Sequence, residues 1–262
     1  MARFRKDTRR RTGGGAAATP TTRSLAILGF HKVGMPPPGS WETWYNVPEA
    51  TFLGFLHYLK ENRWQVLDVT AFLRGLAVPA SLPERATLLT FDDGYRTIME
   101  CALPRLREFG YPGVLFVPTD FIGGFNEFDA NTRWPREAIC GWDELRELER
   151  GGISVQSHGA SHRAFSELDI GEVETELVRS KAVLEDGLGK PVEVFSYPYG
   201  DSGANVEAVR GALRRASYRA ACLYGDGPNL LPVEGPYLLE RVAMGPDTDL
   251  DAELNRSPRA QP

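Results

Sequence analysis

The segment LLTFDDGYRT, residues 88–97, ends an apolar run on two adjacent aspartates and a glycine. An apolar run of this length that stops at a turn signal predicts a buried β-strand over residues 86–91. Two neighbouring carboxylates repel each other and disturb each other's pKa, so a fold retains them only with a compensating partner. Asp92 and Asp93 therefore indicate a site whose other members lie elsewhere in the chain.

The rest of the chain alternates short apolar segments with segments of helical periodicity. Strands are expected at residues 24–31, 64–69, 86–91, 113–117, 153–158, 192–200, 218–224 and 237–244, and helices at 47–62, 70–77, 97–110, 142–150, 170–189 and 205–216. Pro104 predicts a break or a restart in the third helix. Such alternation predicts parallel strands joined by right-handed crossovers. Seven or eight strands favour an α/β fold, a distorted (β/α) barrel in a single domain, with a doubly wound open sheet as the alternative.

The charge of the 262-residue chain is unevenly distributed. Residues 1–23 hold seven Lys or Arg against one acid, and since the net charge is −5, the remainder carries about −11. A region this acidic, the chain after residue 23, is a poor general nucleic-acid binder, because phosphate contacts need basic patches. We expect a basic disordered leader at 1–23, a folded domain at 24–246 and a frayed C-terminal tail at 247–262.

The sequence contains no stretch near the roughly 20 apolar residues that a membrane-spanning helix needs. It also lacks an apolar segment long enough for a signal peptide, so a cytoplasmic location is the default expectation. The three cysteines, Cys101, Cys140 and Cys222, are odd in number and form no CxxC pair. They are expected to be unpaired thiols.

In a barrel, reactive side chains gather at the carboxyl ends of the strands. The segment QSHGASHRAF (156–165) places His158 and His162 four residues apart after a predicted strand. If the chain turns helically there, both imidazoles point the same way, as a metal pair requires. Two histidines and one aspartate would complete the three protein ligands of a catalytic zinc site. One aspartate would then bind the cation and let its neighbour stay ionised as a base.

Three motifs, TFDDG, SHGASH and FSYPYG, carry a resemblance in this order and at these separations. They resemble the signature motifs of the polysaccharide deacetylases (carbohydrate esterase family 4), over roughly residues 25–245. The segments at 25–34 and 47–69 also resemble the subgroup of bacterial surface-polysaccharide deacetylases. The resemblance implies a distorted (β/α) barrel, association with the cell envelope, and metal-dependent removal of N-acetyl groups from an amino sugar or polysaccharide.

The same resemblance assigns roles to four residues. Asp92 matches the family's general base, and Asp93 matches its aspartate metal ligand. His158 and His162 match the two histidine ligands. The implied cofactor is a divalent metal ion, with Zn²⁺ expected and cobalt, nickel, manganese or iron able to use similar ligands.

The third motif agrees with the family pattern only in part. Tyr199 matches the residue whose backbone N–H stabilises the oxyanion, and Pro198 matches the residue that shapes this turn. Ser196 stands where family members often have an arginine that orients the base. The late strand at 237–244 also lacks the histidine that many members carry. His31, at the end of the first strand, is a candidate for the missing general acid, and return of the proton by Asp92 is the other route.

Aromatic residues near the motifs are candidates for contact with a sugar ring. Tyr95 and Trp142, with Pro198 at the third motif, are expected to touch substrate, and Trp134 and Tyr197 are further stacking candidates. Because aromatic residues at such positions more often belong to the core, we expect only one or two of them to stack on substrate. The long irregular segment 118–140, with Asp129 and Arg133, has the length of a functional loop, although a plain surface loop fits it equally well.

Together, the motifs and the resemblance predict a metal-dependent N-deacetylase whose partner is an N-acetylated sugar or glycan. A weakly active or inactive carbohydrate-binding protein on the same scaffold is the alternative, because of Ser196 and the missing histidine. A two-carboxylate glycosidase is disfavoured, since the adjacent Asp92 and Asp93 cannot readily flank a glycosidic bond at the roughly 5–10 Å separation required.

Overall fold

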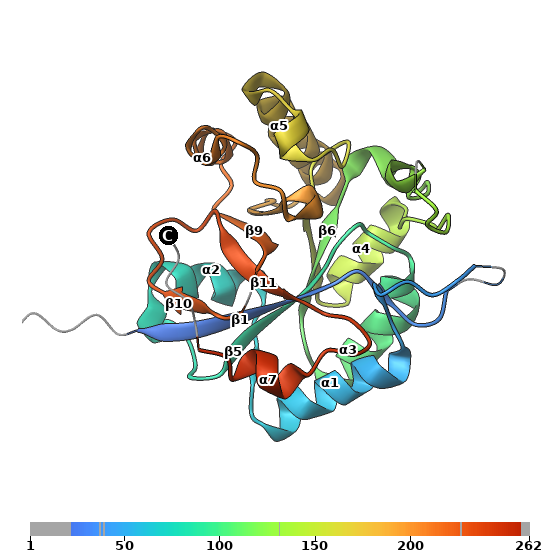
Figure 1. The fold of residues 1–262 in the computed structure, drawn as a ribbon, viewed down its shortest axis with the longest axis vertical. Coiled ribbons are helices and arrows are strands. Elements are labelled where there is room, and N and C mark those ends of the chain that lie inside the picture. The colour runs from blue at the N-terminus through green and yellow to red at the C-terminus, as the bar shows by residue number, and fades with distance from the viewer. Residues whose placement is uncertain (1–21, 37, 39, 131, 226, 258–262) are drawn as a thin grey trace, which may run out of the picture.

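Seven parallel strands form a closed ring in the computed structural model (Figure 1). The structure describes residues 22–257 apart from 37, 39, 131 and 226. The ring order is β1 (Arg23–Phe30), β11 (Leu239–Ala243), β9 (Ala220–Tyr224), β8 (Val194–Ser196), β7 (Ile153–Ser157), β6 (Gly113–Val117) and β5 (Ala86–Phe91). Pairing of β5 with β1 closes the ring. The predicted barrel of about seven strands in one domain is therefore confirmed, and the open sheet is excluded. The predicted leader lies almost entirely outside the described residues.

Apolar strands explain the closure. All six residues of β5 are buried, and β5 pairs with β1 continuously from Leu25–Ala86 to Phe30–Phe91. Parallel strands covered on both faces have this near-continuous apolar sequence. Four short strands lie outside the ring. β4 (Gln65–Val66) pairs with β5, antiparallel β10 (Asn229–Leu231) pairs with the start of β1, and β2 (Lys32–Val33) pairs with β3 (Asn46–Val47).

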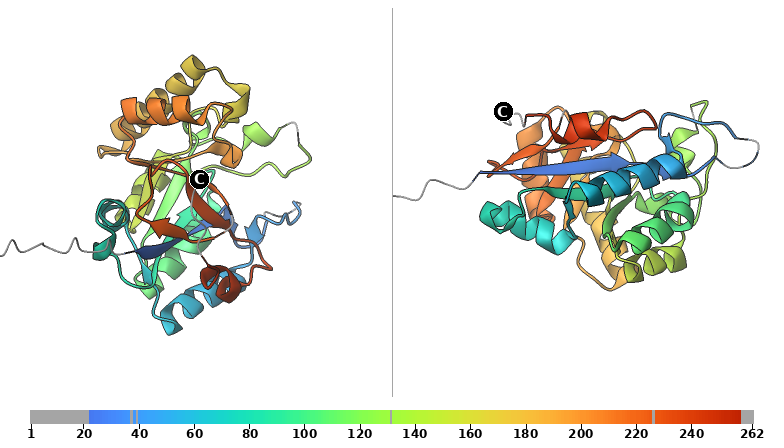
Figure 2. Two further views of the ribbon diagram at one scale, coloured as in Figure 1. Left: turned by 60° about the vertical axis from the view of Figure 1, so that its left-hand side comes forward. Right: turned by 90° about the horizontal axis from the view of Figure 1, so that it is seen from below.

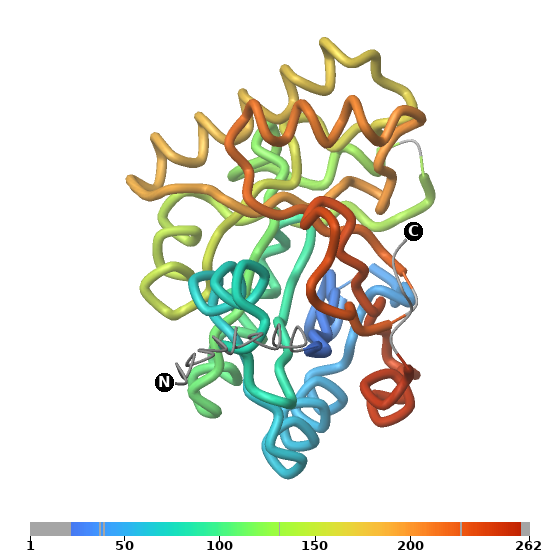
Figure 3. The backbone as a smooth tube through the Cα atoms, turned by 90° about the vertical axis from the view of Figure 1, so that its left-hand side faces the viewer, coloured from blue at the N-terminus to red at the C-terminus, as the bar shows by residue number. Residues whose placement is uncertain are grey.

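Helices surround the ring on its outer face, as Figure 2 and Figure 3 show. They are α1 (Glu49–Glu61), α2 (Val69–Ala77), α3 (Leu103–Phe109), α4 (Trp142–Arg150), α5 (Ile170–Leu188), α6 (Val206–Arg215) and α7 (Leu250–Leu254). The restart expected at Pro104 is present, because a π-helical turn over Ile98–Ala102 gives way to α3 just before this proline. Within the described part of the chain, no helix combines the length and apolar character needed to cross a membrane.

The C-terminal segment is more ordered than the sequence indicated. Residues expected to fray contain α7, whose first turn is capped by the Asp249 side chain accepting from the Ala252 N–H. Leu250 and Leu254, one helical turn apart, are both buried in the core. The helix is short, so its stability depends on this packing rather than on its length.

The segment 118–140 is irregular, as expected, and contains only the short 3₁₀ turns Thr119–Phe121 and Glu127–Asp129. It is nevertheless tied to the barrel. Lys32, the first residue of β2, forms an ion pair with Glu137, and both side chains are almost completely buried. All three cysteines are unpaired, as expected.

Candidate active site

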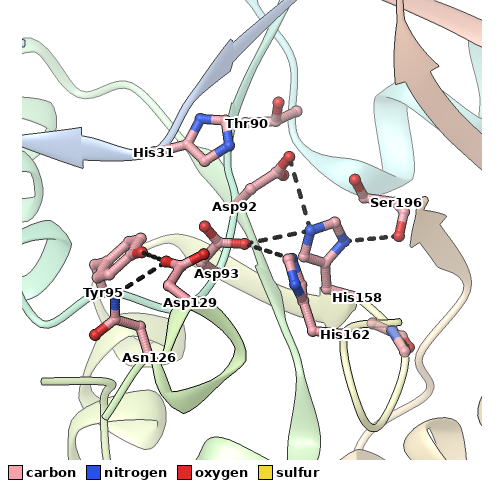
Figure 4. A network of polar contacts seen from close by, with 12 residues as sticks. His31, Thr90, Asp92, Asp93, Tyr95, Asn126, Asp129, His158, His162 and Ser196 are labelled. Carbon is pink, nitrogen blue, oxygen red and sulfur yellow. Dashed lines mark hydrogen bonds and ion pairs between the residues drawn. The ribbon is translucent and has the colours of Figure 1, made fainter. Parts of the chain in front are cut away.

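The four motif residues converge at the carboxyl ends of two ring strands (Figure 4). Asp92 and Asp93 directly follow β5, and His158 directly follows β7. Together with His162 they are between 1% and 6% exposed. The expected helical turn between the histidines is absent, because the segment is irregular and His162 has a left-handed backbone with φ 58°. A local turn with this left-handed residue brings the two imidazoles together instead.

The geometry around Asp93 fits a bound cation. Its Oδ1 atom lies 3.4 Å from Nε2 of His158 and 3.1 Å from Nε2 of His162. One potential ligand atom from each of the three side chains lies within 4.8 Å of the others. Asp93 Oδ1 is buried and has no hydrogen-bond partner among the described residues. A buried carboxylate oxygen between two imidazole nitrogens is a donor set that divalent metals use.

The tautomer of His158 is set by its second ring nitrogen. Nδ1 lies 2.7 Å from the backbone carbonyl oxygen of Ser196, so Nδ1 carries the proton and donates it to that carbonyl. The lone pair on Nε2 then faces Asp93, which is the arrangement of a histidine ligand oriented from behind. Burial opposes ionisation of Asp93, but positive charge on the His162 and His158 imidazoles outweighs it and holds the pKa of this carboxyl well below its usual range. With neutral imidazoles, a bound cation would supply that positive charge instead.

Asp92 is held by a buried arginine that the sequence analysis missed. Arg241 donates from Nη1 to Oδ1 and from Nη2 to Oδ2 of Asp92, both at 2.7 Å, and its side chain is fully buried. The Tyr224 hydroxyl also donates to Asp92 Oδ2, at 2.9 Å. Burial works to raise the pKa of Asp92, but the charges of Arg241 and His158 bring it below its usual value. The carboxylate is therefore ionised and fixed in orientation.

Arg241 also contacts the residue at which the third motif departs from the family pattern. Its Nη2 donates to the Ser196 hydroxyl at 2.8 Å, so the guanidinium reaches the surroundings of that serine from another strand. The available signal was a single arginine inside the apolar strand later seen as β11, where the sequence analysis looked only for a histidine. A charged residue at an inward position of a barrel strand needs a partner of opposite charge.

Left-handed backbone conformations concentrate in this site. Among the described residues, five non-glycine residues have positive φ, and three of them are Asp93 (70°), His162 (58°) and Tyr199 (57°). Such conformations cost about 1–3 kcal/mol each and persist where the surrounding structure enforces them. The Tyr199 ring packs on His162 with 4.7 Å between centroids.

The side chains of Asp92, Asp93, His158 and His162 line a pocket of about 450 Å³. Two other expected site residues, His31 and Tyr199, line it, as does Trp134. Burial lowers the pKa of His31 despite the nearby carboxylates of Asp93 and Asp92. Its Nδ1 lies 3.5 Å from the Tyr224 hydroxyl.

Other expected substrate residues lie away from the pocket lining. Tyr95 is 2% exposed, and its ring lies against the Lys32 ammonium. Trp142 packs on α5, where a Cβ atom at Gly187 would come within 2.1 Å of its ring. Pro198 and Tyr197 are buried. The pocket is instead lined by aromatic residues that the sequence analysis did not select, namely Trp44, Tyr45, Phe128 and Tyr224.

Residues 80–221, more than half of the chain, match the sequence model of the family described as polysaccharide deacetylase. The chain therefore belongs to the polysaccharide deacetylase family. This agrees with the barrel and with the Asp–His–His cluster at the carboxyl ends of its strands.

Individual relatives are distant. YxkH of Bacillus subtilis, whose own assignment as a polysaccharide deacetylase is provisional, is 24% identical over 222 residues, covering 85% of this chain and 72% of YxkH. Poly-β-1,6-N-acetyl-D-glucosamine N-deacetylase of Staphylococcus epidermidis is 25% identical over 195 residues, covering 68% of this chain and 65% of that enzyme. The structure of Streptococcus pyogenes deacetylase PplD matches 90% of this chain and 100% of its own with a TM-score of 0.76, and at 19% identity the likeness shows a shared fold.

Proposed function

We propose that this protein is a metal-dependent hydrolase that removes N-acetyl groups from an N-acetylated amino sugar or glycan. The observation that carries the proposal is the buried Asp93–His158–His162 cluster with the ionised Asp92 beside it. Family membership supports it, as do the names of relatives that act on poly-β-1,6-N-acetyl-D-glucosamine. The S. pyogenes deacetylase structure holds acetate, the product of such a reaction.

Asp93, His158 and His162 would hold the metal ion, for which we propose Zn²⁺. A bound divalent metal polarises a carbonyl group and lowers the pKa of water to near 7 in well-known zinc enzymes. Cobalt, nickel, manganese and iron accept similar ligands. The choice between them is decided by metal analysis of the purified protein.

The chain's own residues provide the proton transfers. Asp92 accepts the proton of the attacking water, while Arg241 and Tyr224 hold its carboxylate in place. General-base catalysis of this kind contributes typically about 10²–10⁴-fold. The backbone N–H of Tyr199 is proposed to donate to the developing oxyanion, and such a donor is worth about 3–4 kcal/mol in comparable sites.

His31 is proposed to give a proton to the leaving amine. It follows β1 and lies on the far side of Asp92 from His162 (Figure 4). Burial lowers the pKa of His31, so its protonated form gives up a proton more easily than a free imidazolium, but only a minor fraction is protonated at neutral pH. The competing route returns the proton from Asp92, and substitution of His31 separates the two.

An inactive carbohydrate-binding protein remains the second candidate, because the late strand lacks a histidine. The other reason was that Ser196 stands where family members often have an arginine. This reason carries less weight because Arg241 donates hydrogen bonds both to the Asp92 carboxylate and to the Ser196 hydroxyl. Binding of acetylated oligosaccharides without any acetate release would favour this second function.

The direct test measures bound metal and acetate release on the same samples. Asp93→Ala, His158→Ala and His162→Ala should each lose the metal and the release of acetate from N-acetylglucosamine oligosaccharides. Asp92→Asn should lose acetate release while retaining metal, which separates the base from the ligands. Acetate release at the original rate from chelated, metal-free protein would refute the mechanism.

A further inference from the structure

The two histidines of the candidate metal site are oriented in different ways. His158 is fixed through its ring, because Nδ1 donates to the Ser196 carbonyl oxygen. Nδ1 of His162 is buried and has no hydrogen-bond partner among the described residues. Its ring packs on Phe128 and Tyr199, with 4.2 and 4.7 Å between centroids, but such packing supplies no directional bond. The position of His162 therefore depends mainly on the backbone turn that carries it.

That turn, residues 159–162, has an unusual backbone conformation. Gly159 has φ 78° and His162 has φ 58°, both in the left-handed region. A residue with a Cβ atom keeps such a conformation only where the surrounding structure enforces it. The carbonyl oxygens of Gly159 and Ala160 accept hydrogen bonds from backbone N–H groups shortly after β6. The N–H groups of the turn have a different partner.

This partner is the carboxylate of Glu176, on α5. Its Oε2 atom accepts from the Ala160 N–H at 2.7 Å and from the Ser161 N–H at 2.8 Å. A Cβ atom at Gly159 would lie 3.2 Å from the same oxygen, so the glycine leaves room for the close approach of the carboxylate. Hydrogen bonds from backbone N–H groups to a carboxylate are among the stronger ones in proteins. One oxygen atom thus fixes two successive N–H groups between the histidines.

Among the described residues, the turn supplies the closest partners of the Glu176 carboxylate. Glu176 is 8% exposed and is buried on α5 together with Val173 and Leu177. Its other oxygen, Oε1, lies 3.9 Å from Nη2 of Arg179, which pairs with Asp120 at 2.6 Å. A buried carboxylate needs donors that replace its lost hydration. The two N–H groups of the turn are the donors that meet this need.

We propose that Glu176 is a positioning residue for the metal site. Its carboxylate holds the turn 159–162 and so keeps Nε2 of His162 beside Asp93 Oδ1, at 3.1 Å. The inference rests on the metal site of the proposed function. Since Glu176 acts as an acceptor for backbone N–H groups, the location of its oxygen matters more than its charge. Partners that orient metal ligands typically contribute about 10–100-fold in metal affinity or activity.

Two conservative substitutions separate location from charge. Glu176→Asp keeps the charge but draws the oxygen back by one methylene, whereas Glu176→Gln keeps the length and one acceptor oxygen. We expect Glu176→Asp and Glu176→Ala to weaken Zn²⁺ binding by about tenfold to hundredfold, and Glu176→Gln to recover most of the affinity. The measurement is Zn²⁺ Kd by competition with a chromogenic chelator, using the full metal-free chain. Weak binding by Glu176→Gln with normal binding by Glu176→Asp would overturn the proposal in favour of simple charge attraction.

Cobalt gives a second readout, because its visible absorption depends on the geometry of its ligands. At saturating Co²⁺, Glu176→Asp should change the spectrum and Glu176→Gln should keep it. Glu174→Ala is the matched control, since Glu174 also belongs to α5 but has a 44% exposed side chain paired with Arg215. This control should keep both the Zn²⁺ Kd and the Co²⁺ spectrum of the unchanged protein.

A purely structural role of Glu176 predicts a different result. Glu176→Asp would then lower the urea midpoint of the metal-free protein, while its folded fraction would bind Zn²⁺ with unchanged Kd, and this outcome would overturn the inference. The comparison of Glu176→Asp with Glu176→Gln decides the question even where Glu176→Ala does not fold. Because the metal titrations need no substrate, a lack of acetate release would refute the hydrolase and leave the inference standing. A lack of Zn²⁺ and Co²⁺ binding by the unchanged chain would refute the metal site and the inference together.

Discussion

Replacement of Arg241 by methionine tests how Asp92 is kept ionised. In the unchanged protein, burial raises the pKa of Asp92 and the charges of Arg241 and His158 lower it, with a net lowering. Methionine has similar length but no charge, so burial gains the upper hand and the pKa of Asp92 rises. An opposite charge at this range is worth about 1–3 pKa units. The acid limb of kcat/KM should therefore move to higher pH by about that amount.

The same replacement affects stability with a definite sign. Because the folded pKa of Asp92 lies below its unfolded value, its contribution to stability is present above the unfolded value and is lost as the pH falls through the folded pKa. Arg241→Met removes the fully buried partner, which typically costs about 3–5 kcal/mol at neutral pH. Urea unfolding at pH 7 and at pH 4 should show a smaller difference between variant and unchanged protein at the lower pH.

The assay is a pH profile of kcat/KM, with metal content and circular dichroism recorded on the same samples. Arg241→Lys, which keeps the charge but not the paired hydrogen bonds, should give an intermediate shift. The exchange Ser196→Arg with Arg241→Ser places an arginine where the family often has one and should restore part of the acid-side activity. An acid limb that stays in place in folded, metal-bound Arg241→Met would refute this account of Asp92.

Three further predictions concern other parts of the site. His31→Gln should lower kcat by about 10²–10⁴ with metal content unchanged, and a kcat near that of the unchanged protein would instead place the proton return on Asp92. Tyr224→Phe removes one hydrogen bond to Asp92 and should move the acid limb upward by less than Arg241→Met does, so an equal or larger shift would contradict the dominance of the arginine. Lys32→Met leaves the buried Glu137 carboxyl without its ion-pair partner and should lower the free energy of unfolding by about 3–5 kcal/mol. In urea unfolding, Lys32→Met with Glu137→Leu should recover much of that loss, and a double variant no more stable than the single one would count against the pair.

The sequence predicted the positions of those site residues that stand at the ends of apolar strands. Asp92 and Asp93 end an apolar strand, and His158 ends another, so their positions follow from the period and boundaries of neighbouring segments. The barrel was predictable for the same reason. The turn that brings His162 back was not, because it uses a left-handed backbone at a non-glycine residue, and no helical spacing indicates that.

The missed residues have no local signature. Trp44 becomes a rim residue only because the segments before β3 and after β6 meet above the carboxyl ends of the strands. Tyr224 looks like the last residue of an ordinary strand, and its contact with Asp92 spans 132 residues of sequence. Such contacts depend on the register of the closed ring, which the apolar pattern of single strands does not fix.

Arg241 shows how an arginine from another strand can pair with Asp92 although the third motif has a serine at position 196. In the ring, β11 pairs with β1, and β1 pairs with β5, so Asp92 is two strands away from Arg241 across a closed, packed interior. Side chains that point inward from alternate strands of a barrel meet in shared layers. A guanidinium at the right level can therefore reach the same carboxylate from a different strand. The ionisation and orientation of Asp92 depend on a positive charge at that level of the barrel, and not on the sequence position that supplies it. The double exchange Ser196→Arg with Arg241→Ser should therefore keep Asp92 ionised and retain part of the acid-side activity. Neither Ser196→Arg nor Arg241→Ser alone should retain as much.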